Sequence, residues 1–176
     1  LRIERLRTAD DPIFAPAMAL YAASFPEHEQ RLDPSQCRIM AHEQYHFGLL
    51  CDGERFAGLA LYWDAGAYFY VEHLCITESM RGKGCGSRAL ALLRKKGKKM
   101  IREIDPPVDP VSQKRQRFYE RAGYQANPYP HIHPPYRTEY AGHPLVVMSW
   151  PGGLSEQEYH SFYQYLKQTV MQEQNC

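Results

Sequence analysis

Three glycines alternate with charged and small residues at positions 81–87, in the order Arg-Gly-Lys-Gly-Cys-Gly-Ser. Glycines allow successive backbone N–H groups to converge on a ligand without obstruction by side chains. The segment follows an apolar run at 67–76 and precedes a helical pattern, so a helix N-terminus adds partial positive charge. Arg81, Lys83 and Arg88 bring formal positive charge to the same place. The spacing predicts an anion site suited to a pyrophosphate; the alternative is a flexible glycine-rich turn.

Two common nucleotide-binding loops do not fit this segment. A Walker A loop requires a lysine directly before the Ser or Thr at the helix start, and Gly86 precedes Ser87 here. A Rossmann loop requires GxGxxG, whereas Gly82, Gly84 and Gly86 give GxGxG. Rossmann units also repeat strand, helix and strand in parallel, while this loop follows a predicted antiparallel meander. Both nucleotide interpretations are therefore set aside.

The loop resembles the signature of the GNAT superfamily of acyl-CoA-dependent N-acyltransferases, [Gln/Arg]-x-x-Gly-x-[Gly/Ala]. The signature stands here as residues 81–86, after the hydrophobic Leu74-Cys75-Ile76. A second family element, a Tyr followed by a Gly-aromatic pair that closes a helix, stands as Phe118-Tyr119-Glu-Arg-Ala-Gly123-Tyr124. The expected helix and strand separate the two motifs. The resemblance covers roughly residues 1–150, and the pairing of the motifs makes it specific.

The resemblance implies which residues bind coenzyme A. In the family, the backbone amides of the loop hold the pyrophosphate. The preceding strand is bulged and splays from the next strand, here 100–104, and pantetheine lies in the gap. A bulge frees N–H groups, so one of them can polarise the thioester oxygen. Many members carry Asn seven positions before the motif tyrosine, where Ser112 stands here. The expected cofactor-binding residues are Leu74, Cys75, Ile76, Arg81, Gly82, Lys83, Gly84, Cys85, Gly86, Ser87 and Ser112.

Glu72 and Tyr119 are the predicted catalytic residues. The resemblance implies that Tyr119 protonates the departing thiolate, whereas its place in an aromatic pair on a helix also fits the core. Glu72 is flanked by apolar residues, and partial desolvation is expected to raise its pKa into the range of a general base. The alternative is a solvated glutamate. Strand alternation predicts that His73 points to the opposite face from Glu72, and deprotonation through water also remains open.

The pattern of apolar residues changes along the chain from helical spacing to strand-like runs, and these patterns predict the elements that position the candidate residues. Asp52-Gly53 is a strong hairpin signal between two apolar runs, and a third run completes an antiparallel meander. The fold class expected is α/β, or α+β: a GNAT-like mixed, mostly antiparallel sheet with helices on both faces and an extra C-terminal helix. The predicted strands are 1–7, 45–51, 55–63, 67–76, 100–104 and 145–150, and the predicted helices are 12–25, 34–44, 87–96, 112–122 and one from 155 onward.

Composition bounds the function classes. The chain has 176 residues, 44% of them apolar and 23% charged, which is typical of one globular domain. The 21 basic and 20 acidic residues nearly cancel, which disfavours nucleic acid as a partner. The longest apolar run, 56–63, is too short for a membrane helix. No secretory pattern and no CxxC spacing is present. We expect a cytoplasmic chain with one domain over 1–176, of which 151–176 form a helical extension.

Three remaining features are interpreted conservatively. Residues 81–102 hold nine Lys and Arg and no acid, and a solvated helix end is favoured over a nucleic-acid surface. His131 and His133 are spaced as metal ligands can be, but no third ligand is placed, so no metal is expected. The Tyr-, His- and Pro-rich segment 125–144 is a substrate wall or an ordered surface loop. The aromatic C-terminal helix packs on the core or on a second subunit, which leaves a homodimer possible.

The resemblance implies an N-acetyltransferase that moves an acetyl group from acetyl-CoA to a primary amine by direct transfer. The acceptor is a small-molecule or peptide amine that the sequence does not identify. The alternative is a non-catalytic acyl-CoA-binding sensor on the same fold.

Overall fold

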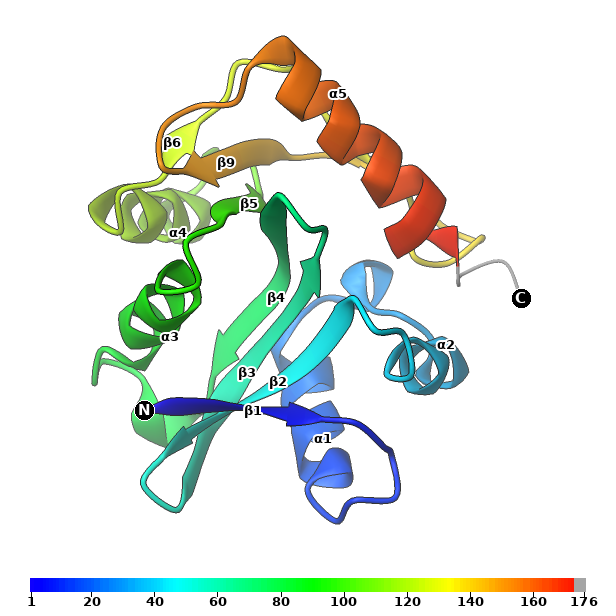
Figure 1. The fold of residues 1–176 in the computed structure, drawn as a ribbon, viewed down its shortest axis with the longest axis vertical. Coiled ribbons are helices and arrows are strands. Elements are labelled where there is room, and N and C mark those ends of the chain that lie inside the picture. The colour runs from blue at the N-terminus through cyan, green and yellow to red at the C-terminus, as the bar shows by residue number, and fades with distance from the viewer. Residues whose placement is uncertain (173–176) are drawn as a thin grey trace.

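The computed structural model describes residues 1–172, which form a seven-stranded sheet flanked by helices (Figure 1). The strand order is β1-β2-β3-β4-β5-β9-β6. Neighbouring strands are antiparallel except for β4 and β5, which are parallel. The bounds are β1 Arg2–Leu6, β2 Tyr45–Asp52, β3 Arg55–Asp64, β4 Tyr68–Ile76, β5 Lys99–Ile104, β6 Gln125–Ala126 and β9 Val146–Trp150. The predicted mixed, mostly antiparallel sheet is confirmed.

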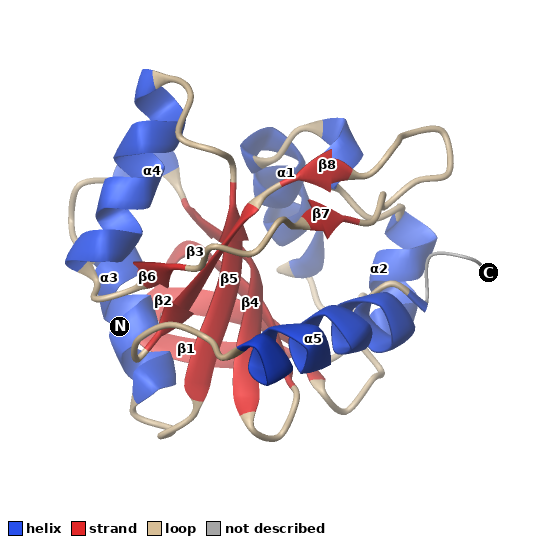
Figure 2. Ribbon diagram, turned by 90° about the horizontal axis from the view of Figure 1, so that it is seen from above, coloured by secondary structure: helices blue, strands red, loops and turns tan. Residues whose placement is uncertain are grey.

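Helices cover both faces of this sheet, as predicted (Figure 2). One face carries α1, α2 and α5, whose Tyr21, Ile39 and Phe162 are buried in one core cluster. The other face carries α3 and α4, which contribute Leu90 and Tyr119 to a second cluster. The helices are α1 Phe14–Ser24, α2 Asp33–Ile39, α3 Cys85–Arg94, α4 Pro110–Arg121 and α5 Glu156–Tyr165. Because helices cover both faces, β3 is buried continuously from residue 57 to 63 rather than at alternate positions.

Several short elements were not predicted from the sequence. Two 3₁₀ turns precede α2 and α3, and two short strands form a separate ribbon within the 125–144 segment. These elements are η1 Glu27–Glu29, η2 Glu78–Met80, β7 Ile132–His133 and β8 His143–Pro144. The π-helical turn η3, Leu166–Val170, continues α5.

A bulge interrupts the pairing of β3 with β4. Leu61 pairs with His73 while the next residue, Tyr62, pairs with Val71, so Glu72 has no partner on β3. Such an extra residue breaks the alternation of side chains along a strand. Glu72 and His73 consequently point to the same face, where both meet Tyr136. The expectation that His73 points away from Glu72 is therefore wrong.

The strands β4 and β5 separate after a short parallel stretch. Only Tyr68, Phe69 and Tyr70 pair with β5, opposite residues 99–101. Apart from Glu72, the rest of β4 stays paired with β3, and the rest of β5 stays paired with β9. The splay that the family resemblance implied is present, and it leaves one edge of β4 free of backbone partners from β5.

The C-terminal helix packs on the core rather than standing away from it. Ser155 and Glu158 form a capping box at its start. Phe162 and Leu166 are fully buried against the sheet. The part of the predicted extension at 173–176 lies outside the described residues. Within the described part of the chain, no helix is long and apolar enough to cross a membrane.

Candidate active site

A cavity of about 680 Å³ opens where β4 and β5 separate. It extends from the end of α1 across the glycine-rich loop to α4. Ten of the residues singled out from the sequence line it together: Leu74, Cys75, Ile76, Arg81, Gly82, Gly84, Cys85, Gly86, Ser87 and Tyr119. The two sequence motifs, more than thirty residues apart, therefore meet at one site.

The glycines of the loop serve two different structural needs. Gly82 and Gly84 have φ values of +76° and +72°, in the left-handed region that other residues rarely adopt. Gly84 directly precedes α3, which explains why this helix begins at Cys85, two residues before the predicted start. At Gly86, a Cβ atom would lie 3.2 Å from the Phe118 ring, so this glycine permits close packing of α3 against α4. The first-turn N–H groups of α3 have no helical acceptors and are left for a ligand in the cavity.

Two predicted cofactor-binding residues lie outside the cavity lining. The Lys83 ammonium lies 3.8 Å from the Met80 sulfur. Ser112 is buried at the start of α4, where its hydroxyl lies 2.9 Å from the Asp109 carboxylate. Ser112 and Asp109 together form a capping box. The position of Ser112 gives it a role in starting α4, and the expected contact with the coenzyme has no support from the geometry.

Tyr119 is both packed and adjacent to the cavity. Its ring contacts Phe118 and Tyr124 edge to face, and the Arg102 guanidinium lies 4.8 Å from its centre. No described residue hydrogen-bonds to its hydroxyl. Burial raises the pKa of this phenol above its ordinary value, so the group remains protonated at neutral pH. Tyr119 can therefore donate a proton within the cavity.

A second, smaller cavity of about 40 Å³ adjoins the first. Phe25, Arg102 and Arg115 line both cavities, so the two spaces meet beside these side chains. Glu29, Glu72, His73 and Glu103 line only the smaller one, together with residues of the 133–145 segment. The Tyr-, His- and Pro-rich segment thus forms part of a cavity wall. That this wall contacts the acceptor stays a prediction.

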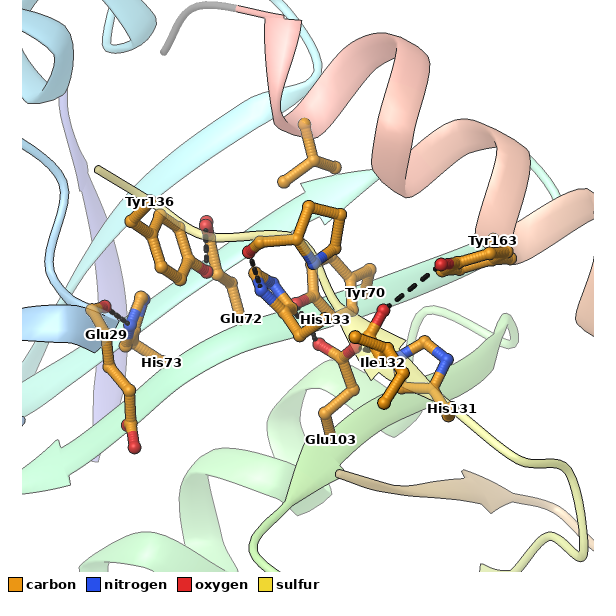
Figure 3. A network of polar contacts seen from close by, with 12 residues as sticks. Glu29, Tyr70, Glu72, His73, Glu103, His131, Ile132, His133, Tyr136 and Tyr163 are labelled. Carbon is orange, nitrogen blue, oxygen red and sulfur yellow. Dashed lines mark hydrogen bonds and ion pairs between the residues drawn. The ribbon is translucent and has the colours of Figure 1, made fainter. Parts of the chain in front are cut away.

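Glu72 is held by three donors, of which Figure 3 shows Tyr136. The Arg31 Nη2 atom lies 2.7 Å from Glu72 Oε1, the Tyr136 hydroxyl donates to the same oxygen at 2.8 Å, and Trp63 Nε1 donates to Oε2 at 2.9 Å. Burial alone would raise the pKa of Glu72, but the Arg31 charge and these hydrogen bonds outweigh it and lower the pKa. The expected rise of this pKa is wrong, and the saturated carboxylate is poorly suited to act as a base.

His73 is a buried, neutral imidazole. Its ring lies edge-on to Tyr21 and Phe25, with centroid distances of 5.0 and 4.5 Å. Its Nε2 atom lies 3.0 Å from the Glu29 carbonyl oxygen, which can only accept, so the ring proton resides on Nε2. Burial lowers the pKa of His73 to about 4. This histidine positions the η1 turn against β4.

The buried carboxylate of Glu103 contacts His131 and His133, the two histidines whose spacing would suit metal ligands. His131 Nε2 hydrogen-bonds to Glu103, and His133 Nε2 lies 3.7 Å from its other oxygen (Figure 3). Tyr70 donates a hydrogen bond to the same carboxylate. Burial acts to raise the pKa of Glu103, but these partners hold it at about 2. The Tyr163 hydroxyl donates to the Ile132 carbonyl at 3.2 Å and fixes the same segment to α5.

One group within the described part of the chain has metal-ligand spacing. The potential ligand atoms of His28, Glu29 and His143 lie within 4.8 Å of one another. These residues belong to the turn η1 and the strand β8, which only the tertiary structure brings together. The expectation that the chain uses no metal stays a prediction.

Three charged residues of the site were not predicted from the sequence. Arg31 neutralises Glu72, Arg102 lines both cavities, and Glu29 lines the smaller one. Burial, and then the neighbouring Asp105 charge, raise the pKa of Glu29. Arg31 and Glu29 lie more than forty residues from Glu72 in sequence, and no local pattern marks them. Arg102 is the last residue of the basic stretch 81–102, for which the sequence favours only a solvated helix end.

Comparisons with known proteins agree with this geometry. The Acetyltransferase (GNAT) family matches residues 13–124. The Bacillus subtilis (strain 168) protein YjbC, named as an acetyltransferase, is 29% identical over 69 residues, which are 38% of this chain and 36% of YjbC. A structure named as a GNAT-family acetyltransferase from Bacteroides thetaiotaomicron has a TM-score of 0.90 at 24% identity, covering 97% of this chain and 98% of that one. An aminoglycoside 6'-N-acetyltransferase complexed with coenzyme A has a TM-score of 0.60 at 15% identity, covering 85% and 96%. The chain belongs to the GNAT family of acetyltransferases.

Proposed function

We propose that this chain transfers an acetyl group from acetyl-CoA directly to a primary amine. The observation that carries the proposal is the 680 Å³ cavity, which joins the free edge of β4, the glycine-rich loop and the Tyr119 hydroxyl at one site. Two structural relatives support coenzyme A as the acyl carrier. The aminoglycoside enzyme and a Bacillus subtilis acetyltransferase were both solved with coenzyme A, at TM-scores of 0.60 and 0.54.

The chain's own groups fit this donor. The first-turn N–H groups of α3 and the charge of Arg81 suit a pyrophosphate. The edge of β4 at 74–76 that faces away from β3 has no partners from β5 and suits the amide groups of a pantetheine arm. Among these N–H groups, one that faces the thioester oxygen stabilises the negative charge that develops there during attack.

In the reaction, the amine nitrogen attacks the thioester carbonyl carbon, and the carbon–sulfur bond breaks as the tetrahedral intermediate collapses. Tyr119 supplies a proton to the departing thiolate. The amine loses its proton to a base, for which the structure favours Glu29 over Glu72. Glu29 has a raised pKa and lines the smaller cavity, whereas Glu72 is saturated by donors and has a lowered pKa. A pKa nearer to neutrality makes a carboxylate a more effective base.

The proposal is tested by measuring release of free coenzyme A thiol from acetyl-CoA across a panel of primary amines. Turnover that depends on the amine, with an N-acetylated product in the mass spectrum, supports it. Binding of acetyl-CoA by calorimetry without turnover on any amine contradicts it and points to the sensor alternative. Measuring binding and turnover on the same preparation separates the two results.

A further inference from the structure

Arg102 is a buried cation for which the described residues provide no carboxylate partner. It lies on β5 immediately after Ile101, the last residue that pairs with β4. Its exposed fraction is 6%, and its Nε and Nη1 atoms are buried without a hydrogen-bond partner among the described residues. Its guanidinium contacts the Tyr119 ring, which supplies no hydrogen-bond acceptor. Both cavities are lined by this side chain.

An unpaired guanidinium at this depth is unfavourable unless a ligand completes it. Removing hydrogen-bonding groups from water without replacing the lost bonds is penalised, and more strongly for charged groups. The chain pairs its other deeply buried arginine, Arg31, with Glu72 and with the Val170 carbonyl. Among the described residues, none provides such an acceptor for Arg102, although it lies next to Glu103 on β5.

Most of the acidic side chains around the smaller cavity are already paired with other residues of the chain. Glu72 pairs with Arg31, Asp105 pairs with Arg115, and Glu103 is held by Tyr70 and His131. Glu29 is the exception, because its nearest basic partner is His28, with Nε2 at 3.7 Å. The lining therefore presents one guanidinium and one carboxylate whose charges no strong ion pair within the described chain compensates.

We propose that Arg102 binds a carboxylate of the acceptor, and that the acceptors of this enzyme are amino acids or similar amines that carry a carboxylate near the reacting nitrogen. The proposal rests on the acetyl transfer proposed above. A guanidinium recognises a carboxylate through two parallel hydrogen bonds, and Glu29 is available for the ammonium end. The donor offers no competing anion here, since pantetheine and an acetyl group are uncharged and the pyrophosphate site lies at the start of α3.

The test compares amino acids with their decarboxylated amines as acceptors. Tyrosine and tyramine, histidine and histamine, and lysine and cadaverine are assayed with acetyl-CoA on the parent and on Arg102→Met. We expect at least one amino acid to exceed its amine tenfold or more in kcat/KM on the parent. Arg102→Met should abolish that preference, because kcat/KM for the amino acid should fall at least tenfold more than kcat/KM for the corresponding amine. Methionine fills a similar volume and removes an unpaired buried charge, so the variant should be no less stable.

A matched control is Arg94→Met. Arg94 also stacks on aromatic rings, those of Tyr124 and Trp150, and donates to the Ala122 carbonyl, but it lines neither of the two cavities. This variant should lose stability and keep the preference for the carboxylate. The assignment is overturned if the parent uses each amine as well as its amino acid. It is equally overturned if Arg102→Met weakens both members of a pair together with acetyl-CoA binding, or if succinyl-CoA replaces acetyl-CoA as the preferred donor.

A binding readout separates this proposal from the proposed function. Thermal shifts are recorded for the coenzyme A complex with each amino acid and each amine. Stabilisation by an amino acid that disappears in Arg102→Met supports the carboxylate site even where no thiol is released, in which case only the acetyl transfer fails. Turnover on amines without any such difference contradicts the carboxylate site and leaves acetyl transfer intact.

Discussion

Glu72 and His73 are neighbours in the chain, yet their side chains lie on the same face of β4, because the bulge leaves Glu72 without a partner on β3. Both residues contact Tyr136. Its hydroxyl donates a hydrogen bond to the Glu72 carboxylate at 2.8 Å, and the centre of its ring lies 5.8 Å from the centre of the His73 ring. Two polar groups are thereby buried side by side on one face, where regular alternation would place them on opposite faces. Glu72 obtains its charge balance from Arg31, and His73 stays neutral.

This arrangement predicts that Glu72 stabilises the fold more than it supports chemistry. Glu72→Gln removes the counter-charge of the fully buried Arg31, and breaking such a pair by removing one partner costs about 3–5 kcal/mol. Urea unfolding should show this loss, while the shape of the pH–rate profile should be unchanged. Tyr136→Phe, which deletes one hydrogen bond to Glu72 and no charge, should lose only about 1 kcal/mol. Parental stability combined with a lost acid limb of the profile would restore Glu72 as the base.

The glycine-rich loop is tested by a pair of matched variants. Gly84 and Gly66 both have positive φ, +72° and +80°, and a Cβ atom at either position meets nothing within 4 Å. Gly84→Val and Gly66→Val should therefore lose similar stability, about 1–2 kcal/mol from the left-handed backbone. Only Gly84→Val should weaken acetyl-CoA binding, by more than tenfold, because its side chain obstructs approach of a phosphate to the helix start. Equal affinity of the two variants by calorimetry would remove the anion-site assignment.

The sequence was sufficient for the mixed, mostly antiparallel sheet and for the loop, because those depend on local patterns. Alternation, hairpin turns and helix caps act within a few residues, and the predicted elements match the observed ones closely. The predicted helix at 34–44 ends early at Ile39, because the following residues form turns that lead into β2, with Tyr45 N–H bonded to the His42 carbonyl. The bulge at Glu72 places the His73 side chain on the opposite face from the one predicted. A bulge of one residue cannot be recognised from the period of hydrophobic residues along the strand.

The charges of the site could not be predicted for a different reason. Arg31, Glu29 and Tyr136 reach Glu72 and His73 only through tertiary packing of segments far apart in the chain. The pKa of a buried carboxylate depends on its partners more than on its neighbours in sequence, so apolar flanks suggested a rise where Arg31 produces a fall.

The buried histidine predicts how stability depends on pH. The pKa of His73 is about 4 when folded and about 6.5 when unfolded, so the unfolded chain binds more protons between these values. Its stabilising contribution is complete above pH 6.5 and is lost as the pH falls toward 4, at up to about 1.4 kcal/mol per pH unit. Glu103, with a pKa of about 2, adds a second loss below its unfolded value of about 4.3. Denaturant melts of His73→Phe should show a flatter slope from pH 6.5 to 4, and a slope equal to the parent's would contradict this account.

Glu29 is predicted to set the acid limb of the pH–rate profile. Its raised pKa means that the carboxylate becomes protonated, and unable to accept the amine proton, at a higher pH than an ordinary glutamate. Glu29→Gln should lower kcat about 10- to 100-fold and abolish that limb, with acetyl-CoA affinity unchanged. Glu27→Gln is the control on the same turn, since Glu27 is exposed and pairs with Arg137. A profile in Glu29→Gln that keeps its limb and height would transfer the role to water.

The last prediction concerns the Tyr119 hydroxyl, which contacts no described hydrogen-bond partner although its ring is packed on three sides. Tyr119→Phe keeps the ring against Phe118, Tyr124 and Arg102, so stability should change by less than about 1 kcal/mol. If the hydroxyl protonates the thiolate, kcat should fall roughly 10- to 100-fold while acetyl-CoA affinity is unchanged. This loss is at the low end of the range for general acids, because a thiolate leaves fairly well unaided.

The matched control is Tyr124→Phe in the same cluster. The Tyr124 hydroxyl lies 3.6 Å from the Met100 sulfur, and Tyr124 does not line the larger cavity. This variant should keep parental kcat. A Tyr119→Phe enzyme as fast as Tyr124→Phe on its best amine would assign Tyr119 to the core, and would leave protonation of the thiolate to water in the 680 Å³ cavity.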